Sequence, residues 1–263
     1  MSRGLRFAGL LAALLIALCA NAGTAAAVPC DPGDNEVVCE NKQPGSPPSE
    51  WDITGAGDPS IQGYATDISV DQGQTVGFKV DTPSSNYRLE IYRLGYYDGD
   101  GARLIATVDP SAALPQAQPA CLGDAPSGLI DCGNWAPSAS WAVPPTAVSG
   151  VYIAKLVRED PEDGRASHVV FIVRDDDGGS ELLLQTDDTT WQAYNSYGGN
   201  SLYTGAPAGR AYKVSYNRPF NSRAATPEDW VFNASYPMLR WIERNGYDVS
   251  YFTGVDSDRL GAE

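Results

Sequence analysis

Hydrophobic and polar positions alternate with a period of two through the middle of the chain, from Trp51 to Val173. The runs at 75–80 and 87–92 alternate, and short runs rich in β-branched and aromatic residues follow at 151–157 and 168–173. Turn-forming segments such as Asp71-Gln72-Gly73 and Ser149-Gly150 separate them. Short strands at this spacing are typical of an antiparallel β-sandwich. We therefore predict an immunoglobulin- or fibronectin-like sandwich over residues 51–176, in a protein that is mainly β.

The pattern changes after the polar segment at 175–179. An apolar run at 181–185 has the length and composition of a strand buried on both faces, and a second β-rich run follows at 247–252. A helical stretch lies between them, so the order strand, helix, strand predicts one right-handed βαβ crossover with parallel strands. We assign this unit to a second, α/β domain over residues 177–263.

The helix of the βαβ unit is predicted from its capping signals. Thr226-Pro227-Glu228-Asp229 combines an N-cap residue, a proline at the first helical position and an acid at the third, and the helical stretch runs to Asn245-Gly246. Pro237 should kink or restart the helix. The later part of the helix is expected to bury four apolar side chains, those of Met238, Leu239, Trp241 and Ile242.

Two parallel strands cannot cover their own faces or close their own edges. We therefore expect residues 177–263 to be the first part of a larger α/β domain, and the sequence to be a fragment. At the other end, residues 28–50 are polar and rich in proline and glycine. This composition predicts an extended leader with almost nothing to bury.

The first 27 residues have the pattern of a cleavable signal peptide. A short basic start is followed by an apolar run from Phe7 to about Ala20 and a small-residue stretch that ends at Ala27. The apolar run is shorter than the ~20 residues that a membrane-spanning helix needs. We expect cleavage between Ala27 and Val28, a secreted product, and no integral membrane segment.

The charge balance argues against one class of partner. The formal net charge is −15, and removal of the signal peptide takes away Arg3 and Arg6 and makes the chain more acidic still. An acidic surface without a basic cluster repels phosphate backbones. Nucleic acid is therefore not an expected partner.

The cysteines point to structural disulfides. Four of the five remain after cleavage, and disulfides persist in the oxidising environment that a secreted protein meets. Local pairing predicts one bridge between Cys30 and Cys39 and a second between Cys121 and Cys132. Neither pair has the spacing of metal ligands, and the chain has a single histidine, His168.

The long connection between the first α/β strand and the helix, residues 187–225, is dense in aromatic residues and glycines. Connections of this length inside a compact domain are usually functional or disordered, and this one is too aromatic to be disordered. It also leaves the carboxyl end of a strand, where open α/β sheets place ligands. From the residues alone, a binding site and an aromatic packing interface are equally good interpretations.

Three segments carry a resemblance to a known family: TTWQAYNSYGGNSLY at 189–203, KVSYNRPF at 213–220 and YPMLRWIERNGYDVSYFTGVD at 236–256. Together they resemble the large (β) subunit of N,N-dimethylformamidase and its secreted relatives. Segments of the sandwich region, QGYATDISV and CLGDAPSGLIDCGNW, are similar to those relatives too. The resemblance spans roughly Ile61 to the end of the chain.

The resemblance implies a glutamine-amidotransferase-like parallel-sheet domain that holds one iron through two tyrosine phenolates and a glutamate. The tyrosines that match are Tyr194 and Tyr203, with Tyr197 or Tyr216 as alternative counterparts. Trp191, Asn195 and Tyr197 are the expected substrate-binding residues. The glutamate belongs to a His-x-Glu motif that is expected beyond Glu263, so the fragment should be inactive by itself.

Two functions follow from these features. The first is a secreted, iron-dependent hydrolase of a small linear amide, in which the metal polarises the carbonyl and activates water. The second is a non-catalytic extracellular module whose exposed aromatic side chains stack on a glycan or another surface. Outside the aromatic connection, His168 has no Ser/Asp partner pattern and is expected to be structural.

Overall fold

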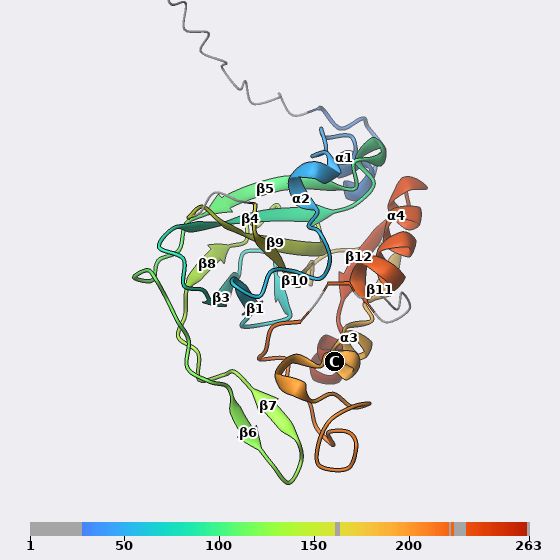
Figure 1. The fold of residues 1–263 in the computed structure, drawn as a ribbon. Coiled ribbons are helices and arrows are strands. Elements are labelled where there is room, and N and C mark those ends of the chain that lie inside the picture. The colour runs from blue at the N-terminus through green and yellow to red at the C-terminus, as the bar shows by residue number, and fades with distance from the viewer. Residues whose placement is uncertain (1–27, 161–163, 221, 224–229, 262–263) are drawn as a thin grey trace, which may run out of the picture.

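The computed structural model describes residues 28–160, 164–220, 222–223 and 230–261. The predicted signal peptide therefore lies outside the described residues. The protein is mainly β, with two larger sheets that face each other and two smaller ones (Figure 1). The three-stranded sheet has the order β1-β3-β8, with bounds Gln62–Ala65, Thr75–Asp81 and Ala139–Ala142. The five-stranded sheet has the order β2-β10-β9-β4-β5, with bounds Ser69–Asp71, Ala166–Arg174, Gly150–Arg158, Tyr87–Leu94 and Ala102–Val108.

One apolar core fills the space between these two sheets. Alternate residues of β3 point into it, and Val76, Phe78 and Val80 are fully buried. The five-stranded sheet contributes side chains such as Leu89 and Phe171 from its facing side. The strands pair antiparallel, apart from the parallel pair β2 and β10. The predicted runs therefore correspond to β3, β4, β9 and β10, which contribute to this core.

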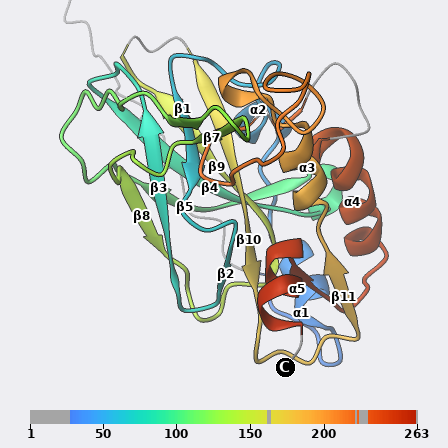
Figure 2. The same ribbon diagram turned by 90° about the horizontal axis from the view of Figure 1, so that it is seen from below.

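The five-stranded sheet is also buried on its second face. Nearly every residue of β9 and β10 is buried, as expected for strands covered on both sides. The cover is the α/β unit, which contains strands β11 (Leu182–Gln185) and β12 (Val249–Phe252) and helices α3 (Asp188–Tyr194), α4 (Tyr236–Arg244) and α5 (Gly254–Leu260). Strands β11 and β12 pair in parallel, as the βαβ pattern predicted (Figure 1). In Figure 2, β11 and the helices α3, α4 and α5 lie on the side of the molecule opposite β3 and β8.

The predicted restart at Pro237 is confirmed. A π-helical turn, Val231–Ser235, precedes α4, and Pro237 lies in the first turn of α4. The predicted start at 226–229 lies outside the described residues. Two of the four side chains expected inside are exposed: Met238 is 54% and Trp241 is 53% accessible, whereas Leu239 and Ile242 are buried. The inward stripe of α4 thus runs through Leu239, Ile242 and the buried Glu243, one helical face.

The prediction that β11 is buried on both faces is wrong. Leu182 and Leu183 are exposed, with Leu183 72% accessible, and only Leu184 is partly covered. The reason is the neighbourhood of the strand: within the described residues, β12 is its one partner in the sheet. An apolar composition gives a strand the capacity to be buried, but the covering elements decide whether it is.

The segment 28–50 is not an extended leader with nothing to bury. It forms α1 (Glu36–Asn41), and α2 (Pro48–Trp51) follows at its end. Asn35 caps α1 by accepting a hydrogen bond from the Val38 amide, and its own amide group donates to the Gly246 carbonyl after α4. Val37 is buried in the core on the second face of the five-stranded sheet.

Both predicted disulfides are present. Cys30–Cys39 closes the loop around the start of α1, and Cys121–Cys132 lies at the base of a hairpin formed by β6 (Leu122–Asp124) and β7 (Leu129–Asp131). We call residues 121–132 the disulfide arm. It extends from the sandwich toward the aromatic connection (Figure 1). In the described part of the chain, no helix is long and apolar enough to cross a membrane.

A buried ion pair joins the sheet to the α/β unit. Arg93 of β4 donates two hydrogen bonds of 2.9 Å to the carboxylate of Glu243 in α4, and neither side chain has any solvent exposure. The Tyr251 hydroxyl and the Asn41 amide also donate to Glu243, at 3.0 and 2.8 Å. Three segments far apart in the sequence therefore meet at one carboxylate.

Candidate functional site

The carboxyl ends of β11 and β12 meet at Asp188, the first residue of α3. Its fully buried carboxylate accepts hydrogen bonds from the Thr186 hydroxyl at 3.0 Å, the Gly254 amide at 2.8 Å and the Tyr216 hydroxyl at 2.7 Å. Thr186 directly follows β11, Gly254 lies two residues after the end of β12, and Tyr216 belongs to the aromatic connection. Asp188 thus ties the connection to the edge of the sheet where ligands bind in open α/β folds.

Burial, together with the hydrogen bond to Asp188, raises the pKa of Tyr216 well above its ordinary value. The phenol is therefore held as a neutral donor to a carboxylate. A metal-bound tyrosine needs the opposite, an ionised oxygen that accepts. The geometry argues against Tyr216 as a phenolate ligand.

Tyr194 and Tyr203 lie together. Their rings stack with centroids 4.2 Å apart and planes inclined by 16°. A backbone hydrogen bond of 3.0 Å from the Leu202 amide to the Ala193 carbonyl joins the two segments next to these tyrosines. Tyr194 is half-buried at the end of α3, and Tyr203 is 57% accessible. Two tyrosines chosen from the sequence are thus neighbours in space.

Arg218 shapes the connection around this pair. Its side chain is fully buried, and its guanidinium donates to the carbonyl oxygens of five residues: Gln192, Asn195, Tyr197, Asn200 and Ser215. Two of those carbonyls flank Tyr194 in the sequence. Burial lowers the pKa of Arg218 to about 10, still far above neutrality. The guanidinium of Arg218 therefore holds the irregular connection in shape by binding its backbone carbonyls.

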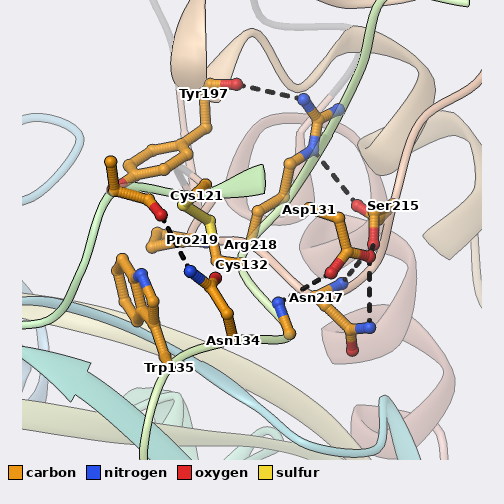
Figure 3. Close-up of a disulfide and its surroundings, with 12 residues drawn as sticks. Cys121, Asp131, Cys132, Asn134, Trp135, Tyr197, Ser215, Asn217, Arg218 and Pro219 are labelled. Carbon is orange, nitrogen blue, oxygen red and sulfur yellow. Dashed lines mark hydrogen bonds between the residues drawn. A yellow bond between two sulfur atoms is a disulfide. The ribbon is translucent and has the colours of Figure 1, made fainter. Parts of the chain in front are cut away.

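The disulfide arm supports the other side of the connection (Figure 3). Asp131 accepts hydrogen bonds from the Ser215 hydroxyl at 2.5 Å and the Asn217 amide at 3.3 Å, while the Cys132 amide donates to the Asn217 carbonyl at 2.7 Å. Burial opposes ionisation, but the donors from Ser215, Gly133 and Asn217 outweigh it and lower the pKa of Asp131. The arm thus fixes the connection through a charged hydrogen-bond acceptor.

The three expected substrate-binding residues do not line one cavity. Asn195 and Tyr197 line a cavity of about 190 Å³ between the connection and the sandwich, whereas Trp191 lines another of about 300 Å³. Asn195 is buried, and its amide group donates to Gln192 and to the Pro219 carbonyl. Tyr197 packs edge-on against Trp135, with ring centroids 6.5 Å apart, and burial raises its pKa. In this arrangement Asn195 mainly holds the connection in shape.

The family model that matches this chain is N,N-dimethylformamidase beta subunit-like, C-terminal, over residues 88–263. The chain belongs to this family. The match begins inside β4 and therefore covers most of the five-stranded sheet as well as the α/β unit. The family assignment made from the aromatic segments is confirmed.

Other comparisons add little. No curated protein matches the chain significantly. Domain 1 of VCBP3 from Branchiostoma floridae is similar to 46% of this chain and 98% of its own, with 12% sequence identity and a TM-score of 0.25. A TM-score this low carries no weight for the fold.

The residues present fit part of the ligand set that the formamidase-like family implies. Tyr194 and Tyr203, whose rings are stacked, each carry a phenol oxygen, the hard donor that suits a highly charged iron. Within the described ranges, one group of three or more His, Cys, Asp or Glu side chains is close enough to share an ion: Cys30, Asp34 and Cys39. Its two cysteines form a disulfide, so that group is not a metal site.

Sequence reasoning missed Asp188 and Arg218. Asp188 could have been identified from the sequence, because two adjacent carboxylates close after an apolar strand mark the ligand edge of an open sheet. Arg218 carried no such signal, because an arginine that binds only backbone carbonyls has no partner residue in the sequence. His168 is structural, as expected: its ring nitrogens contact the Trp51 carbonyl at 2.8 Å and the Ser222 hydroxyl at 3.2 Å.

Proposed function

We propose that the complete protein is a secreted, iron-dependent amide hydrolase of the formamidase type, and that Tyr194 and Tyr203 hold the metal. The observation that carries the proposal is the stacked pair itself, on the connection that leaves the carboxyl end of β11. Membership of the formamidase-like family makes an amide the preferred substrate class.

The role of the chain in this proposal is to position two oxygen donors. Arg218 fixes the backbone on both sides of Tyr194, and Asp188 attaches the connection to the sheet. Iron bound by the two tyrosines would supply Lewis acidity for the attack of water on an amide carbonyl. A carboxylate from the expected His-x-Glu motif after Glu263 would complete the ligand set.

Two further features belong to this proposal. The facing sheets form an immunoglobulin- or fibronectin-like sandwich, and the βαβ unit opens a glutamine-amidotransferase-like domain. Export through the leader at 1–27 would bring the protein to a compartment in which Cys30–Cys39 and Cys121–Cys132 stay oxidised.

The alternative is a non-catalytic module that binds a glycan or another extracellular surface. Its support is the exposure of two aromatic side chains on the connection, Tyr203 and Tyr212. Exposed rings offer flat apolar faces for stacking on a sugar. In this interpretation the tyrosine pair contacts the ligand directly, and no metal is needed.

Iron analysis and visible absorption of a chain extended past Glu263 to the expected motif distinguish the two. We expect about one iron per chain and a phenolate-to-iron absorption band, both lost in Tyr194→Phe and Tyr203→Phe. Tyr212→Phe is the matched control, because Tyr212 is an exposed tyrosine of the same connection, and it should retain both. An iron-free extended chain, or retention of iron and band in both variants, would reject the hydrolase and leave the binding module.

A further inference from the structure

A cavity of about 300 Å³ lies where the second face of the five-stranded sheet, the end of β11 and the start of α4 meet. Its volume is at the lower end of the roughly 300–1,000 Å³ that small-molecule sites occupy. The floor comes from Leu94 of β4 and Val151 of β9, and Trp191 of α3 forms part of the wall. Tyr194 and Tyr203 are not among its lining residues, so the cavity is distinct from the tyrosine pair.

The interior of the cavity is apolar and aromatic. Tyr236 and Tyr251 line it, but their hydroxyls are bound elsewhere: Tyr236 donates to the Gly101 carbonyl at 2.9 Å, and Tyr251 donates to Glu243 at 3.0 Å. Their rings therefore contribute carbon surface to the cavity. Aromatic rings attract an organic cation through their negative faces.

Among the described residues, one charged side chain lines the cavity, the exposed carboxylate of Asp187. Asp187 is the N-cap residue of α3, yet its side chain makes no capping hydrogen bond to that helix. It accepts instead from the Ser235 hydroxyl at 2.9 Å, and Ser235 accepts from the Trp191 indole at 3.2 Å. Because the Asp187 carboxylate bonds to Ser235, it lies at the cavity and does not cap α3.

We propose that this cavity binds a small organic ammonium ion, with its apolar body among Trp191, Tyr236 and Tyr251 and its charged head at Asp187. A neutral ligand would gain no ionic attraction from Asp187, and an anion would be repelled by it. The acidity of the whole chain, with a formal net charge of −15, also favours a cation. The proposal does not depend on the proposed iron chemistry.

Isothermal titration with benzylammonium tests the proposal, with benzyl alcohol and benzoate as the neutral and anionic ligands of similar shape. We expect benzylammonium to bind most tightly. Asp187→Asn should weaken benzylammonium by about two- to five-fold, the effect of one partly exposed ion pair, and should change benzyl alcohol less. Asp258→Asn removes an exposed carboxylate of α5 that does not line the cavity, and should bind benzylammonium as the parent does.

A second variant tests the cavity rather than the charge. Ala234 lines it from the π-helical turn, and Ala234→Leu places an isopropyl group there. Loss of both benzylammonium and benzyl alcohol binding in this variant is the expected result. Absence of benzylammonium binding to the parent, equal affinity for benzoate, or unchanged affinity in Asp187→Asn would each overturn the proposal, whether or not the leucine variant folds.

Discussion

The two faces of the five-stranded sheet are buried in different ways. The face toward β1, β3 and β8 packs through apolar side chains, including a cluster of rings from Phe78, Trp141, Tyr152 and Phe171. The face toward the α/β unit has an apolar cluster too, but it also encloses the ion pair of Arg93 and Glu243. One face is therefore held by non-directional packing, and the other by packing plus hydrogen bonds of fixed geometry.

This difference suggests that the stability of the fold and the orientation of the α/β unit on the sheet have separate physical sources. Apolar burial stabilises many similar arrangements, because it depends on area more than on direction. A bidentate arginine–carboxylate pair is satisfied in one arrangement, because both of its hydrogen bonds need correct distance and angle. We infer that the ion pair sets how the α/β unit, and with it the tyrosine pair, sits on the sheet.

Separation of the two parts should have the largest effect. Residues 178–263 expressed alone should show no cooperative unfolding, because their apolar cluster is completed by Tyr92, Leu94 and Ile153 of the five-stranded sheet and two strands are too few for independent stability. Residues 51–173, with the apolar core intact, should unfold cooperatively. Thermal unfolding followed by circular dichroism checks both pieces, and a sharp transition in the shorter one would contradict the expectation.

Removal of one partner of the buried ion pair should come next. Glu243→Leu leaves Arg93 as a buried, uncompensated cation and should lower the free energy of unfolding in urea by about 3–5 kcal/mol. The double variant Arg93→Met/Glu243→Leu should lose less than this single variant, because no unpaired charge remains.

The ion pair of Arg88 and Glu159, which is partly exposed, provides the control for Glu243→Leu. Glu159→Leu should change the free energy of unfolding by about 1 kcal/mol or less. A double variant as unstable as Glu243→Leu would show that the charge pair is not what the second face depends on.

Acid should weaken the second face through His168. Burial outweighs the hydrogen bond to the Trp51 carbonyl and lowers the pKa of His168 to about 4. The unfolded chain, with a histidine pKa near ~6.5, takes up the proton first as the pH falls. Stability from the neutral imidazole is thus complete above about pH 6.5 and is lost as the pH falls from there toward 4, by roughly 3 kcal/mol in all.

His168→Gln isolates this effect, because His168 is the chain's one histidine. Urea unfolding at a series of pH values should show a steeper loss for the parent than for the glutamine variant between pH 6.5 and 4. Parallel curves for the two proteins would contradict a neutral, buried imidazole. Carboxylates titrate in both proteins and cancel in the difference.

The smallest effects should be equal on the two faces. Ile91 lies in the core between the sheets and Ile153 lies on the second face, and both are fully buried. Ile91→Val and Ile153→Val each remove one methylene group and should each cost about 0.5–1.5 kcal/mol in urea unfolding. A cost at Ile153 several times that at Ile91 would mean that apolar packing, and not the ion pair, distinguishes the faces.

The sequence predicted the elements of the fold better than their surroundings. Period-two alternation located β3 and β4, short β-rich runs located β9 and β10, and the order of apolar runs located the parallel pair β11 and β12. The runs of β9 and β10 were predicted as strands of the sandwich, but their burial on both faces was not predicted. Local periodicity is a property of the chain and is visible without a structure.

Burial in α4 could not be predicted in the same way, because it depends on distant partners. Met238 and Trp241 are apolar and exposed, whereas Glu243 is charged and buried. Glu243 points inward because Arg93, Tyr251 and Asn41 donate hydrogen bonds to its carboxylate, and none of these three residues belongs to α4. The same limit applied to residues 28–50, where Val37 is buried by elements far along the chain.

The candidate site was predictable in its residues and not in its framework. Tyr194 and Tyr203 were identified from family resemblance and lie together in the structure. Their metal binding stays a prediction, as do the substrate roles of Trp191, Asn195 and Tyr197. The framework depends on Arg218, which binds the backbone of its own connection, and on the disulfide arm, and no local pattern relates either of them to the two tyrosines.

The way Arg218 holds the connection has an evolutionary consequence. Because it binds five backbone carbonyls, the shape of the connection is separated from the identity of many side chains upon it. Exposed positions such as Thr204 and Tyr212 can then change while the scaffold persists. A lineage with this arginine acquires new ligand preferences by substitution on a fixed loop, and the same positions suit a randomised library in the laboratory.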